Sequence, residues 1–307
     1  MIQPTHAGRV WSPVITPFND DLSPDPQRFA AHCRWLLDND VGLAIFGTNS
    51  EANSLTVSEK CELIDALAEA GVPGERMMPG TGKCAIGDTV ALTRHAVGHG
   101  CAGVLMLPPF YYKGVSDEGL YRYFAEVIER VADRSLKVYL YHIPPVSQVP
   151  LTLALIERLL KAYPDNVAGI KDSSGDWRNT EAVIREFSAE GFQVYAGSEH
   201  FLLDTLRAGG AGCISATANV NPGPIAELAR TWQEHGADER QAALSRLRHV
   251  FEGYPMIPAL KAATALYGRD EPWFHVRPPL VELDDAQRQG LKAALDEQGF
   301  SMPGLGA

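Results

Sequence analysis

Residues 167–176 have the sequence VAGIKDSSGD, in which a short apolar run ends on Lys171 and passes directly into a polar, glycine-containing turn. Such a run is typical of a buried parallel strand that leads into a loop and then a helix. Lys171 would lie at the end of that strand, where burial disfavours the ammonium form and the amine can attack carbonyl carbons. The ordinary interpretation is a strand-end lysine whose head reaches water, because lysine is rarely buried without a partner. The rest of the sequence decides between the two interpretations.

Seven further short apolar runs resemble the one that ends at Lys171. Together the eight predicted strands are 10–17, 42–46, 77–80, 103–107, 137–142, 167–171, 193–196 and 212–216. Amphipathic segments lie between them, most clearly at 26–37, 58–70, 88–98, 116–131 and 151–162, and Ser116 is a candidate N-cap. Eight strands alternating with helices over about 220 residues predict an α/β fold of the (β/α)8 TIM barrel type. A doubly wound open sheet is the alternative, but residues 15–19 lack the glycine-rich turn that usually follows its first strand.

The strand pattern stops beyond residue 222. The remaining sequence predicts helices at 224–234, 238–251, 258–267 and 284–298. We therefore expect a catalytic barrel domain at residues 1–222 and a C-terminal helical extension at residues 223–307. The extension would pack on the barrel or against a partner subunit.

Composition narrows the possible partners and the compartment. The net charge of −11 at pH 7 disfavours nucleic acid, which needs a basic face. The first nine residues lack the apolar segment of a signal peptide, and the longest apolar runs are too short to cross a membrane. The cysteines are Cys33, Cys61, Cys84, Cys101 and Cys213, an odd and scattered set that suits reduced thiols. The sequence therefore predicts a soluble cytoplasmic protein with no membrane partner.

Two possible sites for phosphate or metal are unconvincing. Residues 79–84 hint at a phosphate loop, but Met77 stands where the pattern needs its first glycine and Cys84 where it needs a hydroxyl. His95 and His99 are spaced i, i+4 and could bind a metal from one helix face. No glutamate completes the metalloprotease pattern between them, so surface histidines are the better interpretation. We expect no metal.

Polar residues gather where the predicted strands end, as catalytic groups do in a (β/α)8 barrel. Residues 47–52 (GTNSEA) follow one strand, 108–113 (PPFYYK) another, and Tyr141 and Lys171 end two more. An amine beside a phenol is the arrangement that Schiff-base chemistry needs, because a nearby hydroxyl moves protons during dehydration of the carbinolamine. Taken alone, Tyr141 would be a core tyrosine, Thr48 a capping hydroxyl and Glu51 a solvated charge.

Three segments carry a family resemblance: 47–51 (GTNSE), 141–144 (YHIP) and 169–175 (GIKDSSG). Tyr111 with 118–121 (EGLY), and 214–220 (ISATANV), extend it, so that it spans residues 14–222 in order and with suitable spacing. On these motifs the chain resembles the dihydrodipicolinate synthase/N-acetylneuraminate lyase family.

The resemblance implies a class I (Schiff-base) aldolase or lyase that acts on pyruvate or another 2-oxo acid with an aldehyde partner. It implies that Lys171 forms the imine, that Tyr141 transfers protons, that Thr48 links Tyr141 into a hydroxyl relay, and that Tyr111 acts across a subunit interface. Thr48 and Asn49 would hold the substrate carboxylate, with Gly197 and Ile214 lining the pocket. No cofactor is expected beyond the covalent imine on Lys171. The assembly would be a homotetramer, or a dimer, of barrels with helical C-terminal segments.

Two departures from the family pattern bear on the substrate. Asn49 replaces a second hydroxyl, and its amide can still hydrogen-bond a carboxylate. Val146 stands where synthases typically carry an arginine that clamps the carboxylate of aspartate semialdehyde, which an aliphatic residue cannot do. Lys83 and Lys113 could supply a replacement charge or could be solvent-exposed loop lysines.

We therefore expect an aldolase for sugar acids or aldehydes, or a dehydratase-type lyase on a 2-keto-3-deoxy acid. The alternatives are a true 4-hydroxy-tetrahydrodipicolinate synthase and a non-catalytic barrel that binds a keto acid.

Overall fold

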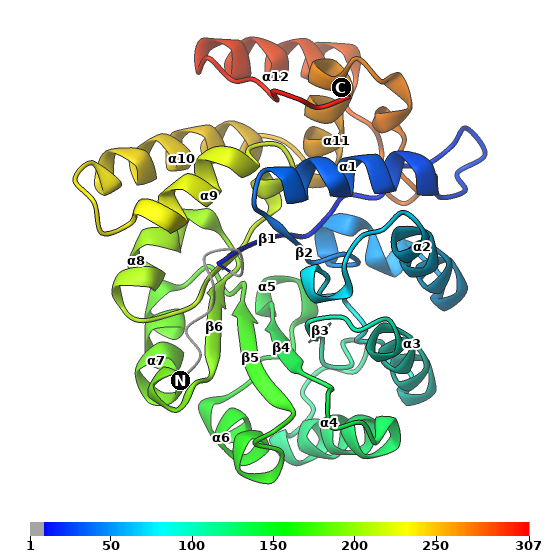
Figure 1. Ribbon diagram of the computed structural model, residues 1–307, viewed down its shortest axis with the longest axis vertical. Helices are drawn as coiled ribbons and strands as arrows, with labels where there is room; N and C mark the ends of the chain where they lie inside the picture. The colour runs from blue at the N-terminus through cyan, green and yellow to red at the C-terminus, as the bar shows by residue number, and fades with distance from the viewer. Residues whose placement is uncertain (1–8, 307) are drawn as a thin grey trace.

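The computed structural model describes residues 9–306; residues 1–8, most of the segment considered above for a signal peptide, lie outside it, as does residue 307. A parallel sheet runs through the centre of the molecule, and helices surround it (Figure 1). The strands are β1 (Val10–Ser12), β2 (Gly42–Leu43), β3 (Val104–Met106), β4 (Val138–His142), β5 (Val167–Asp172), β6 (Gln193–Ala196) and β7 (Gly212–Ile214). They are hydrogen-bonded in the order β2-β1-β7-β6-β5-β4-β3, and every pair is parallel. The predicted α/β class is confirmed.

The predicted strand at 77–80 joins the two edges of this sheet without forming a regular strand. The amide of Met78 donates to the Leu43 carbonyl on the β2 side at 2.8 Å. On the β3 side, the Leu105 amide donates to the Pro79 carbonyl at 2.9 Å. Proline has no amide hydrogen, which explains why only isolated bridges form here. Residues 77–80 therefore form hydrogen bonds with β2 on one side and with β3 on the other.

The first two strands end earlier than predicted. Residues 10–17 were expected to be one strand, but β1 ends at Ser12 because Pro13 cannot donate to the ladder. Residues 42–46 were expected to be another, but β2 ends at Leu43 and the chain turns through Phe46, whose φ is 61°. These early ends leave the residues that follow the strands free to form the loops of the site.

Helices follow the strands around the sheet, as predicted. They are α1 (Pro26–Asp38), α2 (Val57–Glu69), α3 (Ile86–Gly98), α4 (Asp117–Val131), the short α5 (Pro144–Ser147), α6 (Leu153–Ala162), α7 (Trp177–Phe187), α8 (Leu202–Arg207) and α9 (Pro222–Thr231). Helix α4 begins at the predicted cap, where Ser116 Oγ accepts the Gly119 amide at 3.2 Å. Helix α2 begins with a capping box in which Thr56 and Glu59 bond each other's backbone amides. No helix within residues 9–306 has both the length and the apolarity needed to cross a bilayer.

Alternation along the strands separates two layers of core. Leu140 and Ile170 pack outward against the helices, in a cluster that includes residues of α4, α6 and α7. Tyr139 points the other way, into an interior cluster with Trp11 and Tyr195. Since Tyr141 and Lys171 are one residue beyond Leu140 and Ile170, the same alternation turns their side chains inward.

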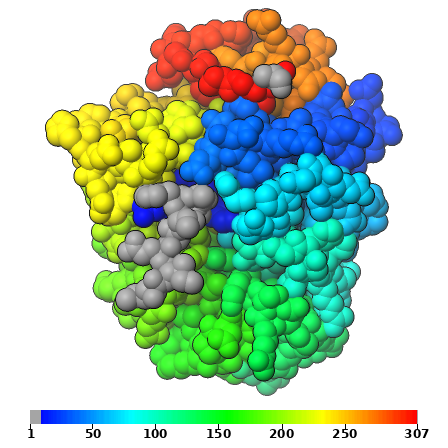
Figure 2. All heavy atoms as spheres, in the orientation of Figure 1, coloured from blue at the N-terminus to red at the C-terminus, as the bar shows by residue number. Residues whose placement is uncertain are grey.

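Beyond α9, the described chain consists of α10 (Ala237–Glu252), α11 (Met256–Gly268), the 3-10 turn η8 (Glu271–Phe274) and α12 (Asp285–Glu297), with loops between them. Helix α10 contacts α8 and α9, and α11 contacts α12. Helix α11 also contacts the 3-10 turn η2 (Thr48–Ser50), which follows β2. In Figure 2 this segment forms the upper part of the molecule, beside the N-terminal residues coloured blue. It therefore reaches the loop that contains Thr48.

Candidate active site

Lys171 and Tyr141 lie on neighbouring strands at the same level. Their Cα atoms are partners in the register of β4 and β5. Lys171 is only 2% exposed, and its Nζ lies 4.4 Å from the centroid of the Tyr141 ring. The amine is therefore held inside the molecule, against an aromatic face, at the carboxyl end of the sheet. The interpretation of Lys171 as a lysine whose head reaches water is excluded.

Thr48 completes the group from a third strand end. Its Oγ1 lies 3.0 Å from the Tyr141 hydroxyl, a hydrogen bond between residues 93 positions apart. Either oxygen can be the donor, because both groups are hydroxyls. The structure thus brings together Lys171, Tyr141 and Thr48 as the sequence predicts, and a proton on either hydroxyl can move to the other.

Hydrogen bonds of Ser50 hold the turn that carries Thr48 in place. Ser50 Oγ accepts the Gly47 amide at 3.1 Å, and the Ser50 carbonyl accepts the Thr16 hydroxyl at 2.8 Å. Thr48 and Asn49 begin the 3-10 turn, so their amides have no hydrogen-bond partner within the turn. Among residues 9–306, these two amides donate no other hydrogen bond. Two adjacent donors are therefore available beside the Thr48 hydroxyl.

Glu51 ends this turn and is not a solvated charge, as it would be if taken alone. Its side chain is fully buried, forms an ion pair with Lys261 of α11, and accepts the Arg277 amide at 2.8 Å. Burial lowers the pKa of Lys261 to about 8, and the Glu51 carboxylate opposes that shift. Glu51 itself has a φ of 55°, in the left-handed region. The ion pair with Lys261 therefore holds the left-handed backbone of Glu51 against the C-terminal helices.

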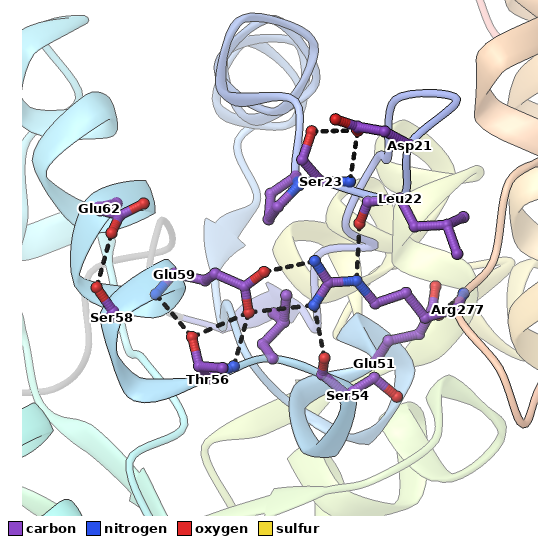
Figure 3. Close-up of polar contacts among 12 residues, drawn as sticks. Asp21, Leu22, Ser23, Glu51, Ser54, Thr56, Ser58, Glu59, Glu62 and Arg277 are labelled. Carbon is purple, nitrogen blue, oxygen red and sulfur yellow. Dashed lines mark hydrogen bonds and ion pairs between the residues drawn. The ribbon is translucent and has the colours of Figure 1, made fainter.

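Arg277, whose amide bonds Glu51, also contacts α2 through its side chain (Figure 3). Its guanidinium donates to the carbonyls of Leu22 at 2.9 Å and Ser54 at 2.6 Å, and it forms an ion pair with Glu59. Hydrogen bonding from Arg277 lowers the pKa of Glu59 to about 2. Arg277 and Lys261 could not be recognised from the sequence, because they are more than 200 positions from Glu51 and no local pattern indicates their contact with it.

Asp172 and His142 connect the carboxyl ends of β5 and β4 to the segments that follow these strands. The Asp172 carboxylate accepts hydrogen bonds from Asn179 at 2.9 Å and Thr180 at 2.7 Å, both on α7. The Leu151 amide donates to Nδ1 of His142 at 3.0 Å. Burial lowers the pKa of His142, with Asp172 opposing the shift. Because Nδ1 accepts this bond, a neutral His142 has its proton on Nε2. Nε2 lies 4.0 Å from the Asp172 carboxylate.

Gly197 and Ile214 lie at the ends of the next two strands. The Gly197 amide donates to the Asp172 carbonyl at 2.7 Å, and a Cβ on Gly197 would lie 2.0 Å from the Ser173 Oγ. Only glycine permits this close approach. Ile214 is fully buried in the interior cluster with Tyr195. Their predicted role in lining the pocket stays a prediction.

A buried polar cluster beside these two residues was also missed. Glu199 accepts hydrogen bonds from Ser215 and Thr217 and forms an ion pair with Arg248 of α10, at 2.9 Å. Glu199 is 1% exposed. The contact fixes the loop after β6 against the C-terminal helices in the same way that Lys261 fixes the turn after β2.

Tyr111 is not brought into the group around Lys171. It is 74% exposed, and its ring packs edge-on against Tyr112. Within residues 9–306 no hydrogen bond joins Tyr111 to Tyr141 or Thr48. The prediction that it acts across a subunit interface stays a prediction.

The two lysines considered as replacement charges are held by backbone carbonyls. Lys83 Nζ donates to the carbonyls of Ala52 at 3.4 Å and Leu55 at 3.3 Å. Lys113 Nζ donates to the Ser147 carbonyl at 2.7 Å and to that of Phe110. Lys113 therefore joins the loop after β3 to α5, the short helix that carries Val146.

A large cleft lies elsewhere in the molecule. It has a volume of about 820 Å³ and is lined by residues near the amino ends of β4, β5 and β6, among them Lys137, Ala168 and Gln193. Functional groups of parallel α/β barrels lie at the carboxyl ends of the strands, where Lys171 is. This cleft is not the site of the lysine.

Comparison with known proteins identifies the family. The sequence matches the Dihydrodipicolinate synthetase family over residues 6–298. The chain belongs to this family. It is 32% identical to an uncharacterized DapA-like lyase of Chloroflexus aurantiacus, over 93% of this chain and 95% of the relative.

Two further relatives bear on its chemistry. The chain is 30% identical to a 4-hydroxy-tetrahydrodipicolinate synthase of Gluconacetobacter diazotrophicus, over 94% of this chain and 95% of the relative. YagE of E. coli K12, a member of the same family solved with pyruvate, superposes with a TM-score of 0.87 at 28% identity, over 95% of this chain and 99% of that one. The chain is therefore an enzyme, a lyase of a family of class I aldolases and lyases.

Proposed function

We propose that this enzyme forms a Schiff base between Lys171 and the carbonyl of pyruvate or a 2-keto-3-deoxy acid, and makes or breaks a C–C bond or removes water. The observation that carries the proposal is the buried Lys171 amine, 4.4 Å from the ring of a tyrosine whose hydroxyl bonds Thr48 at 3.0 Å. Family membership supports it. A binder without catalysis would not need a buried amine beside a hydroxyl pair.

The chemistry follows from these positions. The Lys171 amine attacks C2 of the 2-oxo acid, and the carbinolamine that forms loses its hydroxyl as water to give the imine. The protonated imine accepts the electron pair of the C3–C4 bond, which breaks to release an aldehyde and leave an enamine. The Tyr141 hydroxyl donates the proton with which the leaving hydroxyl departs as water. As the C3–C4 bond breaks, the C4 hydroxyl of the substrate loses its proton, which returns to Tyr141 through Thr48.

The turn after β2 is suited to hold the substrate carboxylate. The free amides of Thr48 and Asn49 can donate two charge-assisted hydrogen bonds to it, and the Thr48 hydroxyl lies beside them. The rigid attachment of this turn through Glu51 keeps the donors in place. We propose no cofactor and no metal in this reaction.

Val146 points to the class of acceptor. It is 62% exposed on α5, and its isopropyl group offers no charge for a second carboxylate. We therefore propose an aldehyde or sugar-acid fragment rather than aspartate semialdehyde. The named function of the Gluconacetobacter relative supports the alternative, a 4-hydroxy-tetrahydrodipicolinate synthase. Comparable kcat/KM values for aspartate semialdehyde and for the best of a panel of aldehydes and 2-keto-3-deoxy acids would favour that alternative.

A Val146→Arg variant tests this assignment directly. A bidentate arginine–carboxylate pair is expected to raise kcat/KM for aspartate semialdehyde by at least about tenfold and to leave imine formation with pyruvate unchanged. Val146→Leu is the control, because it changes bulk without charge. Equal rates for both variants would contradict the role given to this position.

Borohydride trapping tests the imine. Reduction in the presence of pyruvate should add to the enzyme the mass of pyruvate less one oxygen atom, and peptide mass spectrometry should place the adduct on Lys171. The other lysines serve as internal controls, and Lys171→Met should give no adduct. A wild-type enzyme that carries no adduct on Lys171 would rule out the proposed chemistry and favour a keto-acid-binding barrel.

We also propose that the sheet is part of a closed (β/α)8 barrel with residues 223–307 as its helical extension, and that the enzyme is a cytoplasmic homotetramer or dimer. The hydrogen bonds of 77–80 to both sheet edges support closure. Exposed Tyr111 and Tyr112 support a partner surface, and the five unpaired cysteines suit a reducing compartment. Light scattering gives the oligomeric state, and Tyr111→Phe should lower kcat if Tyr111 acts in a partner's site.

A further inference from the structure

Three potential metal ligands converge on the outer surface, between α2 and α3. Asp65 is on α2, and His95 and His99 are on α3, where the i, i+4 spacing places both rings on one face. The two helices lie side by side in the ring around the sheet (Figure 1). One ligand atom from each residue lies within 4.8 Å of the other two. No other three His, Cys, Asp or Glu side chains among residues 9–306 approach in this way.

The atoms already face one another. Nε2 of His95 and Nε2 of His99 each lie 2.8 Å from the same oxygen of Asp65, and the two rings are 4.8 Å apart at their centroids. A tetrahedral zinc ion with bonds of about 2.1 Å keeps its ligand atoms roughly 3.4 Å apart. The two contacts with Asp65 would therefore have to open by about 0.6 Å, which small side-chain rotations achieve.

The site is open to an incoming ion. The side chains are 46%, 28% and 27% exposed for Asp65, His95 and His99. With three protein ligands, a fourth position remains for water. Two imidazoles and one carboxylate suit a borderline ion such as Zn²⁺ better than Mg²⁺ or Ca²⁺, which prefer oxygen ligands only.

We propose that Asp65, His95 and His99 form a surface site for Zn²⁺ or a similar divalent transition ion. Bound metal would link α2, which follows the turn that carries Thr48, to the neighbouring α3. Lys171 lies on a strand inside the ring, so the ion takes no part in the imine chemistry and acts by stabilising the folded state. The histidine spacing alone did not indicate this, because the third ligand comes from another helix, 30 residues away from His95.

Calorimetric titration of untagged, chelator-treated enzyme with Zn²⁺ tests the proposal. Wild-type protein should bind one ion at this site, and Co²⁺ should give the visible absorption of a tetrahedral site. Asp65→Asn, His95→Asn and His99→Asn should each weaken binding by at least about tenfold. His235→Asn, which changes an exposed histidine in the loop before α10, should bind as wild type does. Zn²⁺ should raise the melting temperature of wild type and of the His235 variant only.

Trapping of pyruvate on Lys171 checks that each variant is folded, and it also separates the two proposals. Loss of zinc binding with retained trapping supports the site. Two results would overturn the zinc site, whatever the result of trapping. The first is a wild-type enzyme that binds no stoichiometric Zn²⁺. The second is that the His95→Asn and His99→Asn variants bind Zn²⁺ as tightly as wild type.

Discussion

At the residue scale, the proposed mechanism depends on the hydrogen bond between the Tyr141 and Thr48 hydroxyls. Tyr141→Phe removes the proton carrier beside Lys171 and should lower kcat by about 10²- to 10⁴-fold. Thr48→Val removes only its partner and should lower kcat less. If the hydroxyls act in one relay, the double variant should be no slower than Tyr141→Phe. Steady-state kinetics of the three variants, with the best substrate of the panel, measure this.

Tyr139→Phe is the matched control for this prediction. Tyr139 is on the same strand and also points inward, but its hydroxyl bonds Gln193 at 2.7 Å, toward the other end of the sheet. Burial also raises its pKa to about 12. Because its hydroxyl bonds Gln193 and not Thr48, we expect Tyr139 to take no part in proton transfer at Lys171. A loss of kcat in Tyr139→Phe equal to that in Tyr141→Phe would mean that general disturbance of the core, and not proton transfer, explains both.

The residues of the site differ in how well the sequence predicted them. Lys171, Tyr141 and Thr48 each end or follow an apolar run, so strand patterns alone place them at the carboxyl ends of predicted strands. Glu51 could not be recognised as buried, because its partner Lys261 is on a helix about 200 residues later and no periodic pattern records that contact. Tyr111 is exposed in the single chain, so any catalytic role depends on a second subunit that one sequence does not describe.

At the scale of elements, hydrophobic patterns predicted where strands and helices lie, and β4 and β6 end where expected, but the ends of other strands were wrong. The strand predicted at 10–17 is cut at Pro13, although each residue after it is still apolar or buried. The run at 77–80 contains Pro79 and makes only isolated bridges. In both cases the missing proline amide decides the outcome, and an apolar pattern does not reveal it.

The attachment of α2 to the segment after α11 can be tested by pH. The hydrogen bond from Arg277 lowers the pKa of Glu59 from 4.5 to about 2 in the folded protein. The pairing therefore stabilises the protein above pH 4.5, and this stability is lost as pH falls toward 2. Glu59→Gln should lower stability by about 1 kcal/mol at pH 7, and the difference from wild type should vanish near pH 2. Thermal unfolding as a function of pH measures it.

Glu62→Gln provides the control on the same helix. Glu62 is exposed and accepts a hydrogen bond from Ser58 at 2.7 Å (Figure 3). Within the part of the chain that the structure describes, no arginine forms an ion pair with it. Its removal should change stability little at any pH. If the two variants lose stability equally at pH 7, the Arg277 contact does not hold α2 as described.

At the scale of the whole molecule, the C-terminal helices hold the turns of the candidate site rather than only extending the fold. Lys261 of α11 holds the turn after β2, and Arg248 of α10 holds the loop after β6 through Glu199. Both contacts are ion pairs buried from solvent, where loss of one partner leaves an uncompensated charge. The sequence predicted helices in this region, but their contact with the site required the folded structure.

Lys60 gives the stability of the whole molecule a pH dependence that can be measured. It lies on α2, is 1% exposed, and burial with the neighbouring Lys83 lowers its pKa from 10.5 to about 6. Between these pH values the unfolded chain binds a proton that the folded protein does not, so stability rises with pH by up to roughly 1.4 kcal/mol per unit. Lys60→Met should therefore stabilise the enzyme, and by more at pH 7 than at pH 10.

Unfolding by urea at both pH values measures this difference, with Lys292→Met as the control. Lys292 is on α12, is 48% exposed, and pairs with Asp296, so its removal should leave the pH dependence of wild type intact. A buried amine that must lose its proton on folding weakens the fold as pH falls, whereas an exposed paired amine does not. If Lys60→Met kept the pH dependence of wild type, Lys60 would have to remain charged in the folded protein.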